Sequence, residues 1–285
     1  MDIEKKYPKA ILVSSKRNYQ DQDHYDLPDL ISRALQSKSN LFIEFTKGDN
    51  IDKFTFRLLD PLGNQFYFGD NVDTLCLTMF KRIQFLQTMT RTGSYQIGEK
   101  ISAPISFENF LTVVKEHSIV FNRLIQKPST VTRFLGNTSF RCTHGFPSLK
   151  QNNQIFVSRR NVDKSGITTE NMVAVKQIPE GVGYYGQDKP SVDTPIQLEL
   201  YKKYPHIQFM LHGHVYVKDA PFTNQIVPCG SFEEVEEICK LGNNDTSFVV
   251  NLKGHGFTAL STDIQFIQDL QFYSRPVPEE QILEN

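Results

Sequence analysis

The sequence predicts a mixed α/β protein, and three features of the chain support that prediction. Short apolar segments alternate with helical ones in the first hundred residues. An amphipathic helix begins near Phe107, and the run 247–256 is typical of a buried strand that ends in a glycine-flanked turn. The N-terminal strands are expected at residues 10–15, 41–46, 54–59 and 65–68, and the helices at 27–36 and 72–89.

The N-terminal region has the local signals of a small α/β unit. The sequence DPLGN at Asp60–Asn64 has strong turn chemistry and predicts a hairpin. Pro28 fits the first turn of the early helix. The later helix has an apolar face formed by Leu75, Met79, Ile83 and Leu86. The region is either a separate small domain or an N-terminal extension of a larger sheet.

The segment Arg91–Ser106 is polar and contains two glycines and a proline, which is typical of a linker. The helix that follows has apolar residues at helical spacing, namely Phe110, Val113, Val114, Phe121 and Leu124. We therefore expect an N-terminal α/β region of unknown role over residues 1–95, a linker over 96–106 and the main domain over 107–285.

Composition limits the classes of function. The 285 residues carry a formal net charge of −1, which gives no general attraction to nucleic acid or anionic membranes. No apolar run approaches a membrane span, and the start MDIEKKYPKA lacks the apolar core of a signal peptide. The four cysteines show no CxxC spacing and are most simply reduced thiols. We expect a cytoplasmic protein that binds neither nucleic acid nor membranes.

The most informative motif is the pair His212 and His214. Residues i and i+2 of a strand project from the same face, so the two imidazoles would lie side by side. Gly213 between them leaves the opposite face open for close packing. Two imidazoles on one face can bind a metal that prefers nitrogen and oxygen donors, although a pair of hydrogen-bonded histidines is the simpler interpretation.

A third ligand is expected at His255, in a turn with a glycine on each side. The carboxylate of Asp193 lies upstream of the pair, across one predicted helix. Three histidines and a carboxylate near an open coordination position are typical of a catalytic metal site.

Five segments resemble the class II aldolase/adducin family, in the family's order and at about its separations. They are GNTSFR at 136–141, IFVSRRNVDKSGITTENMVAV at 155–175, PSVDTPIQLELYKKYP at 190–205, HGH at 212–214 and KGHGFTALSTD at 253–263. The resemblance covers roughly residues 107–285 and implies an α/β/α fold with a central antiparallel sheet.

The resemblance also implies a chemistry. A divalent metal, most often Zn²⁺, would be held by His212, His214 and His255, with Asp193 as the acid/base residue. Aldol-type cleavage of a small sugar-like hydroxy-carbonyl compound would then proceed through a metal-stabilised enediolate. Tyr273 resembles a late tyrosine that reaches a neighbouring subunit's site, and is otherwise an aromatic residue in a subunit contact. Family sites lie between subunits, so we expect a homo-oligomer, such as a tetramer.

Phosphate-binding loops are only partly matched. The first loop is intact at Gly136, Asn137 and Ser139, and the third contributes Ser191. The second has Arg159 and Arg160 in place of the family's Thr-Gly. Two arginines can bind a phosphate or carboxylate through bidentate bonds, or they can be solvated loop charges.

Alternatives remain within the resemblance. The 4-epimerase branch carries Asp where the aldolases carry Glu, so the local sequence at Asp193 favours epimerisation. A dehydratase would use the same metal chemistry, and an adducin-like binding protein would keep the fold without turnover. The segment after the histidine pair is short, and Tyr216 and Asp219 are the nearby polar candidates in it. For Tyr216 a packing role in the core is the favoured interpretation. His117 is expected to be structural, and His144 could face the site.

Overall fold

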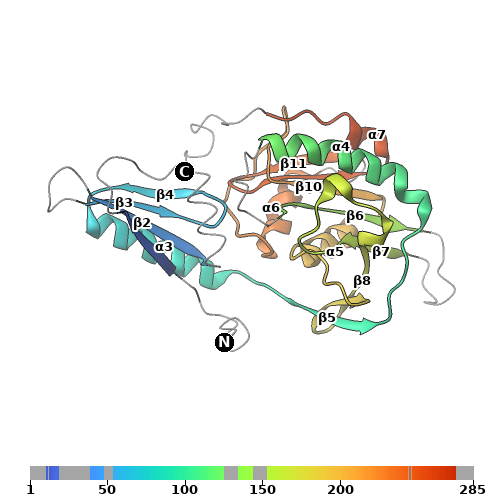
Figure 1. Ribbon diagram of the computed structural model, residues 1–285, viewed down its shortest axis with the longest axis horizontal. Coiled ribbons are helices and arrows are strands. Elements are labelled where there is room, and N and C mark those ends of the chain that lie inside the picture. Colours follow the sequence, from blue (N-terminus) through green and yellow to red (C-terminus); the bar gives the residue numbers. More distant parts are fainter. Residues whose placement is uncertain are drawn as a thin grey trace. The chain divides into compact units, whose positions relative to one another are not determined.

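The computed structural model describes residues 11, 13–18, 39–47, 54–124, 134–143, 153–242, 244 and 246–273. The contacts divide the described residues between Met89 and Thr90 into a smaller N-terminal unit and a larger unit. Figure 1 shows both units, coloured along the sequence. The helix predicted at 27–36 and His144 lie outside the described residues.

The N-terminal unit is a four-stranded sheet with one described helix. Its strand order is β1-β2-β3-β4, with β1 parallel to β2 and the other neighbours antiparallel. The elements are β1 (Val13–Asn18), β2 (Leu41–Lys47), β3 (Phe54–Leu59), β4 (Gln65–Gly69) and α3 (Val72–Thr88). The first strand thus begins later than the predicted residues 10–15.

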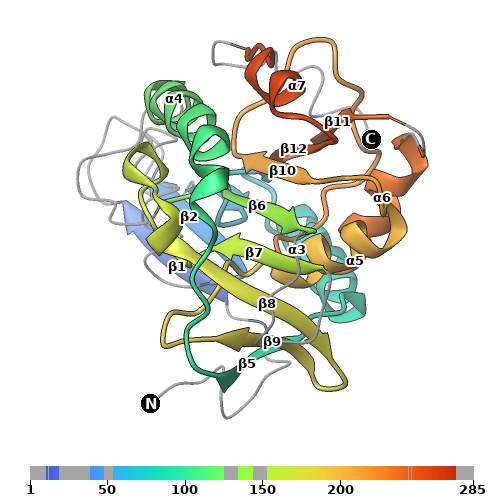
Figure 2. The same ribbon diagram turned by 90° about the vertical axis from the view of Figure 1, so that its right-hand side faces the viewer.

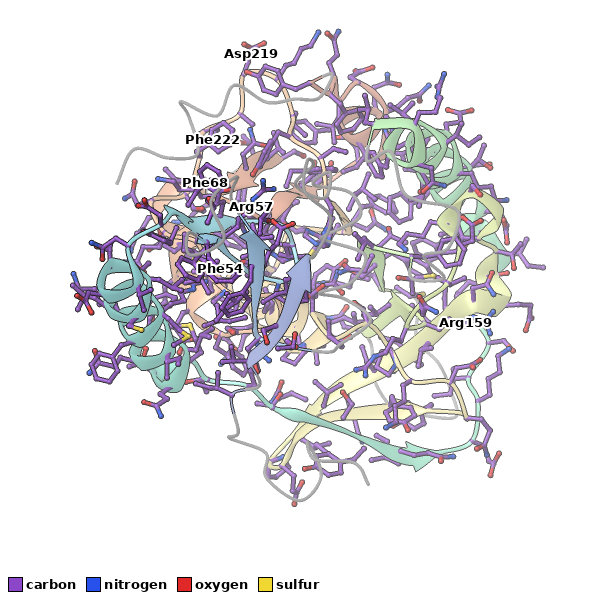
Figure 3. All side chains as sticks on the ribbon, turned by 60° about the vertical axis from the view of Figure 1, so that its left-hand side comes forward. Phe54, Arg57, Phe68, Arg159, Asp219 and Phe222 are labelled. Atoms are coloured by element: carbon purple, nitrogen blue, oxygen red, sulfur yellow. The ribbon has the colours of Figure 1, made fainter. Side chains whose placement is uncertain are left out.

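Local sequence explains this unit. The hairpin predicted at DPLGN is confirmed, because β3 and β4 pair antiparallel on either side of it. One Asp60 carboxylate oxygen accepts from the backbone N–H groups of Leu62 and Asn64 and so stabilises the turn. Asn71 caps α3 by accepting from Thr74 N at 2.9 Å. The predicted apolar face of α3 packs against a core that includes Leu41, Ile43, Phe56 and Leu58. On β3, Arg57 lies 5.4 Å from the ring centroid of Phe68 (Figure 3).

The larger unit is built on an eight-stranded sheet of order β11-β12-β10-β6-β7-β8-β9-β5, in which only the β5–β9 pair is parallel. Its strands are β5 (Gly93–Gly98), β6 (Asn137–Cys142), β7 (Gln154–Ser158), β8 (Met172–Ile178), β9 (Gly181–Tyr185), β10 (Phe209–Gly213), β11 (Phe248–Leu252) and β12 (Gly256–Ser261). The predicted central antiparallel sheet is therefore confirmed.

Helices cover both faces of this sheet (Figure 2). They are α4 (Glu108–Leu124), α5 (Thr194–Lys203), α6 (Glu233–Leu241) and α7 (Ile264–Gln268), with 3₁₀ turns at Ile105–Phe107, Lys164–Gly166 and Thr169–Asn171. One core joins α4 and α7 to Phe209 and Leu211 of β10, and another joins α5 and α6 to Met210. Because neighbouring strand residues face opposite sides, His212 lies on the α5/α6 face with Met210.

The expected linker differs from what the structure shows. β5 spans part of both the predicted 1–95 region and the predicted 96–106 linker, yet it pairs with β9 at the edge of the large sheet. The contact boundary lies at Met89, not at residue 95. Glycines and polar residues in this segment resemble a loop in sequence, but a short, exposed edge strand tolerates the same composition. None of the helices in the described part of the chain has the length and hydropathy needed to cross a bilayer.

Candidate metal centre

Strand register brings the three histidines together. His212 lies in β10 opposite Thr258 of β12, and the next pair joins Gly213 to Phe257. His255 occupies the tight turn that connects β11 to β12, directly before Gly256. The end of β10 therefore lies beside this turn, and His214 follows one residue after the strand. The strand predicted from the sequence includes His212 but ends at Gly213 in the structure, and His214, the next residue, still joins the cluster.

The three imidazoles form a compact, buried cluster. Their possible ligand nitrogens lie within 4.8 Å of one another, and the ring centroids are 5.1, 4.7 and 4.9 Å apart. The exposed fractions of His212, His214 and His255 are only 4, 7 and 4%. Nitrogen donors this close can bind a single ion, and imidazole suits Zn²⁺ and other first-row metals.

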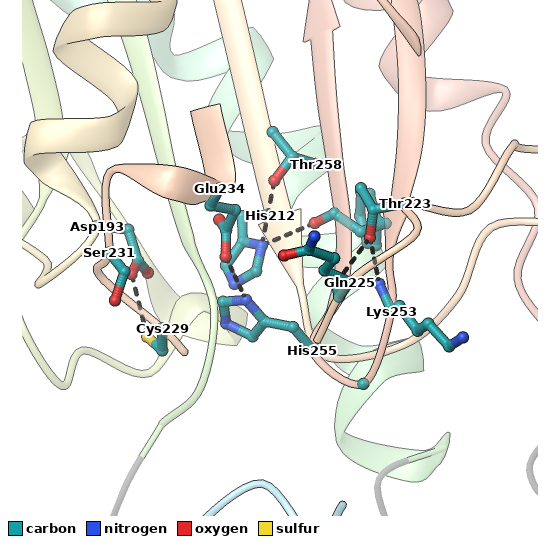
Figure 4. Close-up of polar contacts among 12 residues, drawn as sticks. Asp193, His212, Thr223, Gln225, Cys229, Ser231, Glu234, Lys253, His255 and Thr258 are labelled. Atoms are coloured by element: carbon teal, nitrogen blue, oxygen red, sulfur yellow. Dashed lines mark hydrogen bonds and ion pairs between the residues drawn. The ribbon is translucent and has the colours of Figure 1, made fainter. Parts of the chain in front are cut away.

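Hydrogen bonds at His212 and His255 select which ring nitrogen of these two residues is left to bind a metal. His212 Nδ1 donates to the carbonyl oxygen of Phe257 at 2.7 Å, and His255 Nδ1 donates to Glu234 Oε2 at 2.8 Å (Figure 4). Each bond places the ring proton on Nδ1, so Nε2 carries the lone pair that a metal would need. His212 Nε2 is buried and has no hydrogen-bond partner among the described residues.

Electrostatics favour neutral imidazole at His212. Burial lowers the pKa of His212 to about 4, the charge of His255 acts in the same direction, and Asp193 opposes the shift. A neutral ring is the form that binds a metal. Burial raises the pKa of Glu234, and the interaction with His255 opposes that effect. The donor set of three nitrogen atoms thus fits a divalent metal such as Zn²⁺.

Two glycines allow the backbone to close around the histidines. Gly256 has φ of +138°, and an added Cβ there would overlap the carbonyl oxygen of Gly213. Gly136 has φ of +77°, and its added Cβ would meet the carbonyl oxygen of His212. The segments 136–141 and 253–263 therefore pack directly on the backbone of the HGH strand.

Asp193 lies before α5 and is 7% exposed. Its Oδ2 accepts from Asn137 Nδ2 at 2.7 Å, and its Oδ1 accepts from Cys229 Sγ at 3.1 Å. Asn137 Oδ1 in turn accepts from the side-chain amide of Gln197. The carboxylate is held on both oxygens, and its charge acts on His212.

The residues predicted to bind substrate fall into two groups. Asn137 lies opposite His212 in the sheet, and Ser191 is buried two residues before Asp193, where its Oγ accepts from Asp193 N at 3.4 Å. Ser139 lies opposite Met210, farther along β6, and is hydrogen-bonded to Tyr201 Oη at 3.1 Å. The structure thus brings Asn137 and Ser191 to Asp193, whereas Ser139 packs against α5.

The two predicted arginines directly follow β7. The side chain of Arg159 is 42% exposed and lies 3.7 Å from Asp188 (Figure 3), and Arg160 is exposed. Arg160 N donates to the carbonyl oxygen of Lys189 at 2.8 Å, which ties this loop to the segment that leads to Ser191. No described contact joins either guanidinium to the histidine cluster.

The other aromatic and histidine residues have structural contacts. Tyr273 is half-buried, and its N–H donates to the carbonyl oxygen of Tyr216 at 3.0 Å. Tyr216 Oη accepts from Gly254 N at 3.0 Å and supports the turn that carries His255. His117 donates from Nε2 to the carbonyl oxygen of Ile267 at 2.7 Å, which joins α4 to α7.

Sequence reasoning missed two buried residues of the site, Glu234 and Cys229. Glu234 stands in the run FEEVEEI, where several acids resemble a solvated helix start. A helical projection could have found it, because Glu234 shares a face with the apolar residues Val235 and Ile238. Nothing in the local sequence distinguishes Cys229, whose contact with Asp193 spans 36 residues.

Comparison with known proteins gives one family match. Residues 116–217 match the model of the Class II Aldolase and Adducin N-terminal domain. This range includes Asp193, His212 and His214, whereas His255 lies beyond it.

Several solved structures are similar to the chain at low identity. A YgbL from Klebsiella pneumoniae, described as a putative aldolase/epimerase/decarboxylase, is 13% identical with a TM-score of 0.38, covering 57% of this chain and 81% of its own. An L-fuculose 1-phosphate aldolase is 16% identical with a TM-score of 0.39, covering 59% and 82%. A class II aldolase domain from Thermoplasma acidophilum is 14% identical with a TM-score of 0.37, covering 60% and 92%.

Proposed function

Because its segment 116–217 belongs to the class II aldolase and adducin family, we propose that this protein is a divalent-metal-dependent lyase of the aldolase type. Its substrate would be a small, anionic, sugar-like hydroxy-carbonyl compound. One observation carries the proposal: three buried histidines converge within 4.8 Å beside a buried carboxylate. A structural role would not require this combination.

His212, His214 and His255 would hold the metal, which we propose to be Zn²⁺. Three histidine nitrogens leave one coordination position for substrate, as in other catalytic zinc sites. When bound, the ion would polarise the substrate carbonyl and stabilise the negative charge that develops on carbon–carbon cleavage. His212 supports this assignment, because its buried Nε2 has no hydrogen-bond partner in the part of the chain that the structure describes.

Asp193 would move the proton. In the cleavage direction, its carboxylate would accept the proton of the substrate hydroxyl as the carbon–carbon bond breaks, and it would return a proton to the product. The hydrogen bonds from Asn137 and Cys229 fix both carboxylate oxygens and so limit its motion. An oriented base is more effective than a mobile one because less reorganisation precedes the transfer.

The same site could also serve a 4-epimerase or a dehydratase. Epimerisation uses the same cleavage, followed by rotation of the aldehyde fragment and re-addition. The aspartate at position 193 is the feature that favours this second candidate. Tyr273, reaching a neighbouring subunit's site, is our candidate for gripping the aldehyde fragment. Product analysis separates cleavage from epimerisation, because only cleavage yields two molecules.

Several further features support the proposal. Arg159 and Arg160 are exposed and offer positive charge for a phosphate or carboxylate on the substrate. Ile105 is 81% and Ile119 50% exposed, which would be explained by contacts between copies in a homo-oligomer such as a tetramer. All four cysteines are free thiols, as in a cytoplasmic protein.

The proposal is tested with the full-length protein and a panel of substrates. The purified chain is stripped of metal, reloaded with Zn²⁺ and incubated with ketose phosphates, their unphosphorylated forms and sugar acids. Turnover of an anionic member that requires metal would support the enzyme. If Zn²⁺ binds but no member reacts, the adducin-like binding protein becomes the better account.

A further inference from the structure

We propose that Glu234 is a positioning residue for the metal ligand His255, and that it increases the affinity of the site for its metal. The inference rests on the proposed metal-dependent function. It assigns a separate task to each of the two buried carboxylates beside the cluster: Asp193 handles the proton, and Glu234 acts through the ligand.

The contact between Glu234 and His255 is direct and sheltered from water. Glu234 Oε2 lies 2.8 Å from His255 Nδ1, and the side chains are only 4% and 1% exposed. The contact joins α6 to the β11–β12 turn across 21 residues of sequence (Figure 4). At this distance and burial, the pair forms a strong charge-assisted hydrogen bond.

The turn that carries His255 needs an external support. Gly254 and Gly256, with φ of +69° and +138°, flank the histidine and bring no side chains to hold the ring. The bond from Nδ1 sets the orientation of the imidazole and keeps the ring proton away from Nε2. Glu234 therefore prepares the nitrogen that would bind the metal.

The carboxylate of Glu234 also has an electrostatic effect on the proposed metal site. A carboxylate makes the attached imidazole a stronger donor and adds negative charge near the cation. His212 receives a neutral partner instead, the carbonyl oxygen of Phe257. Of these two proposed ligands, His255 is the one whose donor strength depends on a charged side chain. Because Glu234 touches Nδ1, the nitrogen that does not face the cluster, its position suits a supporting role.

Contacts at the start of α6 fix the position of Glu234. The Glu233 carboxylate accepts from Thr90 N at 3.0 and 3.1 Å, and Phe232 N donates to the carbonyl oxygen of Thr90 at 3.0 Å. Glu234 N donates to the carbonyl oxygen of Ser231 at 3.1 Å. The first turn of α6 is held on several sides, so the glutamate is presented at a defined place.

The test compares Zn²⁺ affinity in full-length variants by competition with a chromophoric chelator. Glu234→Ala removes both the hydrogen bond and the charge, whereas Glu234→Gln keeps an oxygen that can accept from Nδ1 and removes only the charge. We expect Zn²⁺ binding to weaken by about 10- to 100-fold in Glu234→Ala and by a smaller factor, still about 5-fold or more, in Glu234→Gln.

Glu237→Gln is the matched control. Glu237 is a buried acid on the same face of α6, but its carboxylate accepts from Asn224 N and pairs with Lys240. The Zn²⁺ affinity of Glu237→Gln should stay within about 2-fold of that of the parent protein. A substitution that contacts none of the proposed ligands is not expected to couple to the metal site. The Co²⁺-loaded visible spectrum should change in the Glu234 variants alone, because it reports ligand geometry.

The outcomes separate the inference from the proposed function. If the parent protein binds Zn²⁺ and Glu234→Ala binds it equally tightly, the positioning role is wrong while the metal site stands. If Glu234→Ala does not fold, Glu234→Gln decides, and parental affinity in that variant overturns the proposal. If the parent protein binds no divalent metal, the proposed function fails and this inference fails with it.

Discussion

Asn137 donates a hydrogen bond of 2.7 Å to the carboxylate of Asp193, and this contact joins the start of β6 to the start of α5. Asn137 also lies opposite His212 in the sheet. Asn137 is therefore next to both Asp193, the proposed proton carrier, and His212, a proposed metal ligand, and it connects these two parts of the site.

Replacing Asp193 by Asn should retain the metal and slow turnover. The amide keeps the size of the side chain but cannot accept a proton, so we expect the rate to fall by about two orders of magnitude or more. Turnover and zinc content of the variant are measured together. Unchanged turnover would remove Asp193 from the proton-transfer role.

Cys229 is expected to affect turnover through its hydrogen bond to Asp193. Burial raises the pKa of the Cys229 thiol well above its usual value, and the Asp193 charge acts in the same direction, so the thiol stays a donor. Cys229→Ala removes that donor, and we expect kcat to fall about 3- to 10-fold, in keeping with roughly 1 kcal/mol for one hydrogen bond. Cys229→Ser offers a hydroxyl and should recover part of the loss.

Cys76→Ser is the control for this pair, since Cys76 is exposed on α3 of the N-terminal unit. Steady-state kinetics and zinc content are compared across the three variants. Equal kcat values in Cys229→Ala and the parent protein would show that the thiol does not support the carboxylate.

Gly256→Ala should displace the turn that carries His255. The positive φ strains any other residue, and the added Cβ overlaps the carbonyl oxygen of Gly213. We expect the free energy of unfolding to fall by about 2 kcal/mol or more and zinc binding to weaken. Urea denaturation and chelator competition measure the two effects.

Gly166→Ala provides a matched comparison, because its added Cβ meets nothing within 4 Å. It should leave zinc binding unchanged and change stability by less than about 1 kcal/mol. Similar losses in both variants would contradict the account of the turn.

His117 should make the apo protein less stable in acid. Burial lowers the pKa of His117 below its usual value, against the opposing effect of the bond to Ile267. As pH falls through the ordinary histidine value of about 6.5, the unfolded chain gains a proton that the folded chain does not, so the folded state loses stability. Above that pH both states are neutral, and no such loss occurs.

His117→Gln keeps a donor for the carbonyl oxygen of Ile267 and removes the titration. Urea unfolding with chelator present, at pH 7.5 and pH 5.0, should show a smaller acid loss in this variant than in the parent protein. An equal loss in both proteins would exclude His117 as the cause.

The cluster of three histidines was predictable from sequence because its signals are local. His212 lies near the end of β10 and His214 directly follows the strand, and the glycines around His255 indicate a sharp turn. The family resemblance predicted the central antiparallel sheet, and the turn at Asp60 was evident from its residues.

Longer-range contacts were not accessible in the same way. Glu234 and His255 are 21 residues apart in the sequence, and Cys229 and Asp193 are 36 residues apart. No local sequence pattern indicates either contact. The glycines of β5 resemble those of a loop, so its sequence predicts a linker. The pairing with β9, which joins residues 93 and 181, is too distant in sequence to be read from the local pattern. Register also decided that Ser139 lies opposite Met210 and packs against Tyr201 of α5.

The most direct test of the account is the metal content of the purified native protein, beside that of the His212→Ala/His214→Ala form. The account predicts about one divalent ion per chain in the native protein and its loss from a variant that stays folded, because an open catalytic site is not the main source of stability. A native chain without metal even after reconstitution with Zn²⁺, or a double variant that keeps a stoichiometric ion, would contradict it.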